Sequence, residues 1–519
     1  MTYVDTDVLI IGSGFGAAAP ALRLAQAGFR VVMVEKGPPI DPLRDFRQTQ
    51  DPKYLLRYLK GLSGDNLSLT YAEALGGGSG FYEMVSLRAP SQAFAQVDHN
   101  GAPLWPAQLD RAMMDPYYDM AEQMLSVEQI APHEVPKSGL VFAQMMKNLG
   151  YSCERARYAV RGCWGSGFCV TGCIYGAKQS LLLNYLPQAV EAGVTIAANH
   201  EVTRIRPLDE VHNTPRAESL HDTPYRYEVW CCESPTGNWS WYRTKMLILA
   251  GGAVGTAKLL LNAKTDLPLL SDQVGKNVAF NGGVKTAGML PKHFPKGDMF
   301  VGRSHPGMIS YEFLRSHGIT ISAGKPMPLQ AVASARLRLD GDTREPSYWG
   351  TANVELMQQY RHRMMVLVAF GMTPPLGAII RKENGSFETR LPLSDDLRSY
   401  YNETKELLHS IFTGNGCRIV EAKFVDGKGR PHQDLHFSTA HQVGSCRMAD
   451  RKTRGVVDAS GEVFDYPGMY VTDGAAIPSS LAVNTSLTIL ANAERIVAGI
   501  LSRVHVGRPS AGVIVNRET

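Results

Sequence analysis

The sequence predicts an α/β protein with a Rossmann-like nucleotide-binding domain built from discontinuous segments and a second domain with an antiparallel or mixed β-sheet. Three observations support this prediction. The N-terminal segment has the pattern strand, glycine turn, helix, strand. Further strand–turn–helix segments lie far downstream instead of in one compact block. The segments 335–339 and 363–370 alternate in polarity or are apolar, as the strands of a separate sheet are.

The length and composition indicate a globular protein of two domains. A chain of 519 residues exceeds the size at which one core usually divides. The 53 basic and 49 acidic residues leave a net charge of only +4, so we expect neither nucleic acid nor a membrane surface as the main partner. The start MTYVDTDVLIIG lacks the features of a signal peptide, and no segment approaches the roughly 18 apolar residues of a spanning helix. A cytoplasmic location is expected, and export with a partner subunit remains open.

The N-terminal unit, residues 7–37, predicts a dinucleotide site. The apolar run 7–11 stops at a glycine turn, a helical pattern follows, and a second apolar run ends at Glu35. Such a turn lets the backbone approach a pyrophosphate at a helix N-terminus, and the terminal acid accepts hydrogen bonds from ribose hydroxyls. Pro20 predicts a distortion early in the helix. The residues expected to bind the dinucleotide are Gly12, Ser13, Gly14, Phe15, Gly16 and Glu35.

Four more segments extend this pattern along the chain. Residues 73–90 contain three consecutive glycines, a turn whose main-chain N–H groups can contact a flat or anionic ligand. Residues 193–207 contain two short strands, and 246–263 reads as strand, Gly-Gly turn and helix. Residues 468–501 read as strand, Asp-Gly, loop and long helix. A nicotinamide enzyme keeps its cofactor unit in one compact block, so the dispersed arrangement favours another dinucleotide.

These segments together resemble the glucose–methanol–choline (GMC) family of flavoprotein oxidoreductases, and within it the cholesterol-oxidase-like branch. The resemblance covers nearly the whole chain. Its most specific parts are the N-terminal unit, residues 73–90, FCVTGCIYGAKQSLLLNYLPQAVEAG (168–193) and the C-terminal series HQVGSCRM, YVTDGAAIPSS, VNTSLTI and AERI. The middle of the chain, about 285–430, matches by position more than by motif.

The resemblance implies FAD as the cofactor. It also implies that the helix after residue 474 directs its N-terminus toward the flavin carbonyl, where a positive dipole end stabilises reduced flavin. Two departures leave flavin geometry and a covalent link open: Tyr82 and Glu83 stand where the family has asparagine and glycine, and Asn484-Thr485 replaces Asn-Pro. By the resemblance, the ADP half is held by Gly12, Ser13, Gly14 and Glu35, and the backbone of Val202 contacts the adenine region. Near the flavin and its diphosphate lie Gly77, Gly78 and Ser79. The ribityl–pyrophosphate end is held by Asp473 and Gly474.

The motif HQVGSC implies a catalytic histidine, His441, because in this family the histidine of that motif faces the flavin. A neutral imidazole suits removal of a hydroxyl proton, directly or through an ordered water, while a hydride passes to flavin N5. Asn484 would hold the substrate oxygen. Among other histidines, His362 is expected to be a strand-end residue, and His432 and His436 could supply a second polar contact. The methionines Met357, Met364, Met365 and Met372 are expected to be core residues or an apolar wall.

Three cysteines lie close together in the sequence, Cys163, Cys169 and Cys173. Zinc would require a fourth ligand, and none is near. The spacing resembles the trio that ligates an iron–sulfur cluster in some dehydrogenase subunits of the family, which pass electrons to a cytochrome partner. Free thiols are the favoured alternative.

We therefore expect an FAD-dependent enzyme that oxidises a primary or secondary alcohol, with His441 as general base, on a bulky, largely apolar or sterol-like substrate. Oxygen or another acceptor would reoxidise the flavin. The alternative is an iron–sulfur dehydrogenase subunit acting on a sugar or polyol beside an electron-accepting partner. The FAD domain is expected at 1–40, 190–282 and 455–519, and the substrate domain at 41–189 and 283–454, with the loops 73–90 and 438–448 at their interface. A nicotinamide dehydrogenase, a flavin-bound lyase and a non-catalytic binding protein are the other classes that remain open.

Overall fold

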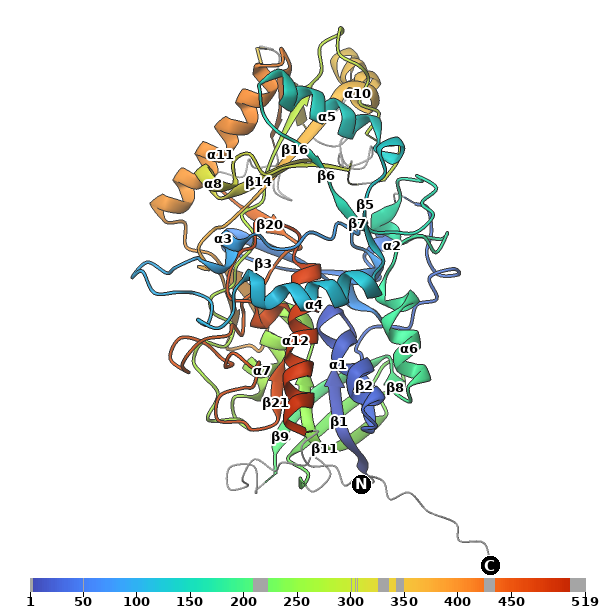
Figure 1. Cartoon of the computed structure of the whole chain (residues 1–519), viewed down its shortest axis with the longest axis vertical. Helices are drawn as coiled ribbons and strands as arrows, with labels where there is room; N and C mark the ends of the chain where they lie inside the picture. The colour runs from blue at the N-terminus through green and yellow to red at the C-terminus, as the bar shows by residue number, and fades with distance from the viewer. Residues whose placement is uncertain are drawn as a thin grey trace, which may run out of the picture.

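The computed structural model describes residues 3–49, 51–208, 223–299, 301–303, 305, 307–324, 336–341, 350–423 and 435–504. Two large sheets organise these residues. One lies in the lower half of Figure 1 and the other in the upper half, and the chain passes between them several times. This arrangement confirms the predicted α/β fold with a Rossmann-like unit assembled from separated segments. The predicted domain boundaries themselves stay a prediction.

The lower sheet has the strand order β8-β2-β1-β11-β10-β9, with β21 paired to β11. Strands β8, β2, β1, β11 and β21 run parallel, whereas β10 and β9 are antiparallel additions. Val8, Leu9 and Ile10 in the C-terminal half of β1 are fully buried, as expected for a strand segment covered on both faces. The strands are β1 (Tyr3–Ile11), β2 (Val31–Val34), β8 (Thr195–Ala197), β9 (His200–Pro207), β10 (Tyr227–Glu233), β11 (Trp239–Leu249) and β21 (Met469–Val471).

Helices cover this lower sheet. In Figure 1, α1 and α12 lie side by side in front of it, with α4 packed against α12 and α6 against α1. Helix α7 packs against β9. The helices are α1 (Phe15–Gln26), α4 (Arg111–Met124), α6 (Tyr185–Glu191), α7 (Gly252–Ala263) and α12 (Ser486–Val504).

The helix α1 continues through Pro20. A proline at this position cannot donate to the carbonyl four residues earlier, which belongs to Gly16. That carbonyl instead accepts a hydrogen bond of 2.7 Å from the hydroxyl of Thr472. The helix therefore tolerates its proline because a side chain from the C-terminal segment replaces the missing donor.

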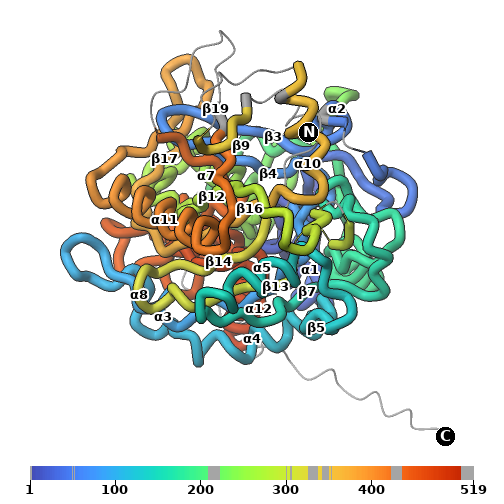
Figure 2. Tube along the Cα trace, turned by 90° about the horizontal axis from the view of Figure 1, so that it is seen from above, coloured from blue at the N-terminus to red at the C-terminus, as the bar shows by residue number. Residues whose placement is uncertain are grey.

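The upper sheet is antiparallel, with the order β15-β19-β12-β16-β14-β13-β6. The helices α5 (Lys137–Asn148), α10 (Thr351–Arg363) and α11 (Asp395–Thr413) pack against it and surround its central strands in Figure 2. Two strands match the predicted segments 335–339 and 363–370. The strands are β6 (Glu154–Arg155), β12 (Val284–Met289), β13 (Met308–Ser310), β14 (Ile319–Gly324), β15 (Arg336–Leu339), β16 (Met364–Gly371) and β19 (Arg418–Lys423).

Short elements fill the region between the two large sheets. Among these elements, the three-stranded sheet β20-β4-β3 positions the loop after residue 439. Its parallel β20–β4 pair brings that loop beside the N-terminal third of the chain. The small strands are β3 (Leu59–Gly64), β4 (Leu67–Ala72), β5 (Val127–Gln129), β7 (Arg157–Ala159), β17 (Ala378–Arg381), β18 (Phe387–Arg390) and β20 (Phe437–Thr439). The short helices are α2 (Pro52–Leu55), α3 (Ser91–Phe94), α8 (Leu314–His317) and the 3₁₀ turns η1 (Gly77–Gly80), η2 (Pro132–Glu134), η3 (Cys169–Thr171), η4 (Leu181–Leu183) and η5 (Gly474–Ala476).

Candidate active site

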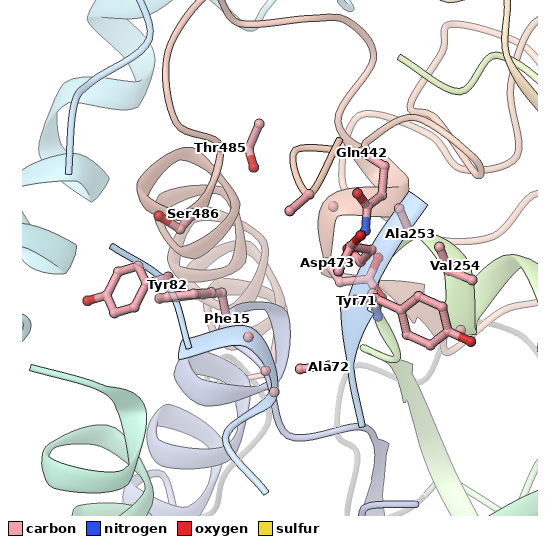
Figure 3. Close-up of a pocket in the computed structure, with 18 of the residues that line it drawn as sticks. Phe15, Tyr71, Ala72, Tyr82, Ala253, Val254, Gln442, Asp473, Thr485 and Ser486 are labelled. Carbon is pink, nitrogen blue, oxygen red and sulfur yellow. The ribbon is translucent and has the colours of Figure 1, made fainter. Parts of the chain in front are cut away.

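An elongated cavity of about 1100 Å³ lies between the two large sheets. One end is lined by the N-terminal glycine turn, Glu35 and Val202, and the cavity continues past His441 and Asn484 to strands of the upper sheet. Figure 3 shows part of the wall, with Phe15, Tyr82, Thr485 and Ser486 on one side and Gln442, Asp473, Ala253, Val254 and Tyr71 on the other. Single ligand pockets usually measure roughly 300–1,000 Å³. The space is therefore adequate for a dinucleotide and a substrate together.

Glycines let three loops meet at the dinucleotide end of the cavity. A Cβ at Gly12 would lie 2.3 Å from the carbonyl oxygen of Ala250, and one at Gly16 would lie 2.5 Å from Cα of Asp473. A Cβ at Gly77, whose φ is +54°, would lie 2.9 Å from Cα of Gly14. Any side chain at these positions would force the loops apart. Three of the predicted glycines are thus required for backbone contact.

The Glu35 carboxylate is buried at the end of β2 and is held from two sides. Its oxygens accept hydrogen bonds from the Ser13 hydroxyl at 2.6 Å and from the Gly37 main-chain N–H at 2.8 Å. The Ser13 hydroxyl in turn accepts from the N–H of Gly76 at 2.9 Å. Burial raises the pKa of Glu35 above its ordinary value, and the two donors oppose that rise. A carboxylate can accept further hydrogen bonds, so Glu35 can still bind ribose hydroxyls.

Asp473 connects two loops beside the cavity. Its carboxylate accepts hydrogen bonds from the N–H of Gly252 at 2.7 Å, the hydroxyl of Thr256 at 2.6 Å and the N–H of Ala475 at 2.7 Å. Burial raises its pKa to about 6. The carboxylate is therefore largely occupied in joining α7 to the 473–475 turn.

Ser79 has a structural role in the turn that contains it. Its hydroxyl donates to the carbonyl of Gly76 at 2.7 Å and accepts from the N–H of Leu181 at 3.2 Å, and the residue is fully buried. Gly77 and Gly78 line the cavity, but Ser79 does not. A contact of Ser79 with the cofactor thus finds no support in this arrangement.

The cavity wall has features that fit a bound flavin dinucleotide. A Cβ at Gly78 would meet no atom within 4 Å, so the turn leaves open space there. Gln442 lines the cavity, and its buried Oε1 has no hydrogen-bond partner within the described part of the chain, although its Nε2 donates to Thr70 at 2.8 Å. Thr485 and Ser486 bring the N-terminus of the long helix α12 to the wall. The unsatisfied Gln442 oxygen suits an N–H or O–H donor of a ligand, and the positive helix end suits an anionic group.

His441 and Asn484 meet at the middle of the cavity, although 43 positions separate them. The amide nitrogen of Asn484 lies 3.3 Å from Nε2 of the imidazole. The ring centroid of Phe370, on β16, lies 4.7 Å from that of the imidazole. The main-chain N–H of His441 donates to the Thr439 hydroxyl at 2.9 Å. These contacts hold the imidazole between the upper sheet and the loop that precedes α12.

Asn281 fixes the other side of the imidazole. Its amide oxygen accepts from the main-chain N–H groups of Leu481, at 3.0 Å, and Ala482, at 2.8 Å. The amide nitrogen must therefore face the opposite way, where it donates to the carbonyl of Val483 at 2.8 Å and to Nδ1 of His441 at 3.3 Å. Because Nδ1 is an acceptor, the hydrogen of the neutral imidazole is on Nε2, and the Asn484 amide must then turn its oxygen, not its nitrogen, toward Nε2–H. No motif or spacing in the sequence points to Asn281.

The imidazole of His441 is neutral over the physiological pH range. Burial lowers its pKa to about 4, and the positive charge of Lys285 acts in the same direction. A second cavity histidine, His305, behaves similarly: burial lowers its pKa to about 4, and its Nδ1 lies 2.6 Å from the hydroxyl of Tyr158. Both imidazoles are thus available as uncharged hydrogen-bonding groups.

Comparison with known families identifies the chain. The GMC oxidoreductase N-terminal model matches residues 7–280, and the C-terminal model of the same family matches residues 397–493. The chain belongs to the GMC oxidoreductase family. Members of this family bind FAD, so the cavity that fits a flavin dinucleotide belongs to an FAD-dependent oxidoreductase.

Relatives of this GMC oxidoreductase include enzymes that act on alcohols. A cholesterol oxidase of Acinetobacter baumannii is 27% identical over 95% of this chain and 93% of its own length. A long-chain-alcohol oxidase of Arabidopsis thaliana is 23% identical over 94% of this chain and 66% of its own length. Among solved structures, formate oxidase of Aspergillus oryzae has a TM-score of 0.67 at 13% identity, covering 98% of this chain and 100% of its own. Pyridoxine 4-oxidase of Mesorbium loti has a TM-score of 0.62 at 14% identity, covering 95% and 99%.

Other predicted residues of the GMC oxidoreductase lie away from the cavity. His362 is in the last turn of α10, two positions before the first residue of β16, and is paired with Asp298. His436 is exposed and bonds the Ser68 hydroxyl at 2.8 Å, whereas His432 is outside the described residues. Met365 is fully buried in the core. The methionines Met357, Met364, Met365 and Met372 do not line the cavity.

The cysteine trio is not arranged as a set of metal ligands in this structure. None of Cys163, Cys169 and Cys173 forms a disulfide, and all three are half-buried. Within the ranges that the structure describes, no group of three His, Cys, Asp or Glu side chains is arranged to hold a metal ion. The iron–sulfur alternative therefore has no structural support. Likewise, no described helix is long and apolar enough to cross a membrane.

Proposed function

We propose that this GMC oxidoreductase oxidises a bulky alcohol to a carbonyl compound at His441 and Asn484. The observation that carries the proposal is the meeting of these two side chains in a cavity continuous with the dinucleotide cradle. The cradle residues that would hold FAD are the glycine turn, Glu35, Val202, Gly77 and Gly78, with the α12 N-terminus at the other end. Bound FAD would supply the acceptor for the hydride that leaves the carbinol carbon.

His441 is proposed to hold the alcohol oxygen through Nε2. With Nδ1 occupied by the Asn281 amide, the neutral ring presents Nε2–H as a donor. A fixed donor stabilises the negative charge that develops on the oxygen as the C–H bond breaks. We favour this role over that of general base, which would require the hydrogen to move to Nδ1, opposite the donor group of Asn281. Asn484, on the Nε2 side of the ring, would orient the same oxygen.

The hydroxyl proton then requires an acceptor other than Nε2, and we assign this role to Glu83. Among the cavity carboxylates, Glu35 and Asp473 are held by main-chain and side-chain donors, and Glu73 and Glu201 are both paired with Lys36, at 3.3 and 3.2 Å. Glu83 lines the cavity and has no hydrogen-bond or ion-pair partner in the described ranges. Its charge also acts on His305, which supports a position near the substrate end. A carboxylate free of partners can accept a proton.

The substrate is proposed to be bulky and largely apolar. The far end of the cavity is lined by Val85, Val368 and Phe370, which offer apolar surface to a hydrocarbon. Oxidases of cholesterol and of long-chain alcohols are among the relatives, which supports the same substrate class. Oxygen or another acceptor would reoxidise the flavin.

One spectroscopic experiment tests this proposal. The purified protein is expected to show the visible bands of FAD, and these bands should bleach anaerobically on addition of a long-chain primary alcohol or a sterol. A panel that includes a sugar and a polyol distinguishes the substrate classes. Bleaching by the sugar alone would contradict the substrate class. A stable flavin spectrum with every alcohol would contradict alcohol oxidation and favour a non-redox use of the flavin.

A further inference from the structure

Three neighbouring strands of the upper sheet place Lys285, Val368 and Ser322 in one row. Lys285 on β12 is paired in register with Val368 on β16, which is paired in turn with Ser322 on β14. Residues paired across strands point to the same face of a sheet, and all three line the cavity. The opposite face is covered by α11, since a Cβ at Gly288 would lie 2.4 Å from the ring of Phe412. The row thus forms part of the cavity roof.

This row lies next to the reacting end of the cavity. Phe370, two residues beyond Val368 on β16, lies 4.7 Å from the His441 ring and points to the same face. Two residues of a strand span about 7 Å. A substrate whose hydroxyl contacts His441 therefore meets the Lys285 row roughly one strand repeat, about 7 Å, farther along the roof. The charge of Lys285 is near enough to lower the pKa of His441.

The polar groups of this row lack partners. Neither the Lys285 ammonium nor the Ser322 hydroxyl makes a hydrogen bond or ion pair with any residue in the described ranges. Other lysines of the cavity differ: Lys36 pairs with Glu73 at 3.3 Å, and Lys258 donates to the Tyr71 hydroxyl at 2.9 Å. An ammonium that is covered by an apolar substrate loses hydration without compensation. A substrate that fills this cavity is favoured if it brings its own counter-charge.

We propose that the alcohol substrate carries a carboxylate, which Lys285 binds with the hydroxyl of Ser322 as a second donor. The proposal rests on the function proposed above and specifies its substrate as a hydroxy acid with an apolar spacer of about 7 Å or more. One ammonium and one hydroxyl match a monoanion. A phosphate dianion is usually bound by arginine forks or several donors, and no arginine is among the described residues that line this cavity.

The other charged group near this end supports the same placement. Glu83 lines the cavity, and no ion pair joins it to Lys285. Its negative charge acts on His305 and Tyr158. A substrate carboxylate is repelled from that wall and attracted to the Lys285 row. The negative charge of Glu83 and the positive charge of Lys285 thus favour one orientation of a bound hydroxy acid, with its carboxylate toward Lys285.

Matched substrates test the proposal. Terminal hydroxy acids of six to twelve carbons are compared with their uncharged primary amides by the rate constant kcat/KM for anaerobic flavin reduction. The wild type is expected to prefer the acids by on the order of 10–100-fold, since hydrogen bonds to charged groups have this strength. Lys285→Met should reduce the preference to within a few-fold of unity, and Lys285→Arg should retain most of it. Lys292→Met, an exposed lysine that does not line the cavity, is the control and should behave as the wild type.

A binding measurement separates failure of this proposal from failure of the proposed function. Calorimetry compares octanoate with octanamide, which lack a hydroxyl, on the FAD-loaded protein. Tighter binding of octanoate that Lys285→Met abolishes supports the carboxylate site even if no alcohol bleaches the flavin. Equal affinity for the two ligands, or an acid preference that survives in a folded Lys285→Met protein, overturns it. The melting temperature of each variant shows whether it is folded.

Discussion

The amide nitrogen of Asn281 lies 3.3 Å from Nδ1 of His441, while its amide oxygen accepts from the main chain of Leu481 and Ala482. One buried side chain therefore connects the imidazole to the loop that carries Asn484. Its four hydrogen bonds leave no freedom for the amide to rotate. The tautomer of the histidine and the position of the loop are consequently determined together.

Asn281→Asp tests this coupling. The carboxylate can still accept from the main chain at 481 and 482, but it replaces the donor to Nδ1 by an acceptor. A negative charge beside the ring favours the imidazolium and raises the pKa of His441 from about 4. We expect an acid limb to appear nearer neutral pH in the pH profile of flavin reduction. Asn281→Ala should instead lower the melting temperature, because buried main-chain groups lose partners at a cost of about 1–3 kcal/mol each. An Asn281→Asp profile that coincides with that of the wild type would disprove the contact.

The wild-type pH dependence follows from the two cavity histidines. The pKa of both His441 and His305 is about 4, below the ordinary value of about 6.5. Between pH ~4 and ~6.5 these two histidines are protonated in the unfolded chain and neutral in the folded one. Their contribution to folding stability is therefore complete above pH ~6.5 and decreases as the pH is lowered toward ~4. Flavin reduction should likewise show no acid limb from His441 until the pH approaches ~4. In Lys285→Met the limb should move upward, because the charge that lowers the pKa of His441 is removed; a limb that stays in place argues against this electrostatic effect.

Removal of the Glu35 carboxylate is expected to weaken FAD retention. Glu35→Ala loses the acceptor for the ribose hydroxyls and also releases the Ser13 and Gly37 donors. The ratio of flavin to protein after extensive dialysis measures the effect. Glu191→Ala, at an exposed position of α6, is the control and should keep its flavin. Full flavin content in Glu35→Ala would exclude the proposed contact.

Two glycine substitutions should have opposite effects on stability. Gly16→Ala would place a Cβ 2.5 Å from Cα of Asp473, and backbone displacement of this kind costs about 1–3 kcal/mol. Gly499→Ala, within α12, would place its Cβ in open space and should stabilise the helix by about 0.5–1 kcal/mol. Melting temperatures measure both. A Gly16→Ala protein as stable as the wild type would show that the α1 and 473 loops need not be in contact.

The dinucleotide unit could be predicted from the sequence because its parts are local. Strand, turn, helix and second strand follow one another within residues 7–37, and each has its own pattern of glycines or apolar residues. The meeting of His441 with Asn484 was available only through resemblance to a family, since no local pattern links residues 43 positions apart.

The remaining features of the site depend on tertiary contacts. Asn281 bonds His441, which lies 160 positions later in the sequence. A single asparagine in a segment that forms no strand gives no sign of such a contact. Ser79 near the flavin stays a prediction; that its hydroxyl bonds Gly76 and Leu181 could not be foreseen, because side-chain direction in a turn cannot be deduced from spacing. The row formed by Lys285, Val368 and Ser322 requires the register of three strands.

The most direct test of the account is the rate of anaerobic flavin reduction by an alcohol that the wild type oxidises, measured in wild type and in His441→Ala. Substitution of deuterium at the carbinol carbon should slow wild-type reduction, because that C–H bond breaks in the step. His441→Ala should retain FAD and lose on the order of 10²–10³ in rate, the cost of removing one fixed donor to a developing oxyanion. Wild-type rates in a flavin-loaded His441→Ala protein, or no sensitivity to deuterium with any alcohol, would contradict alcohol oxidation at this site.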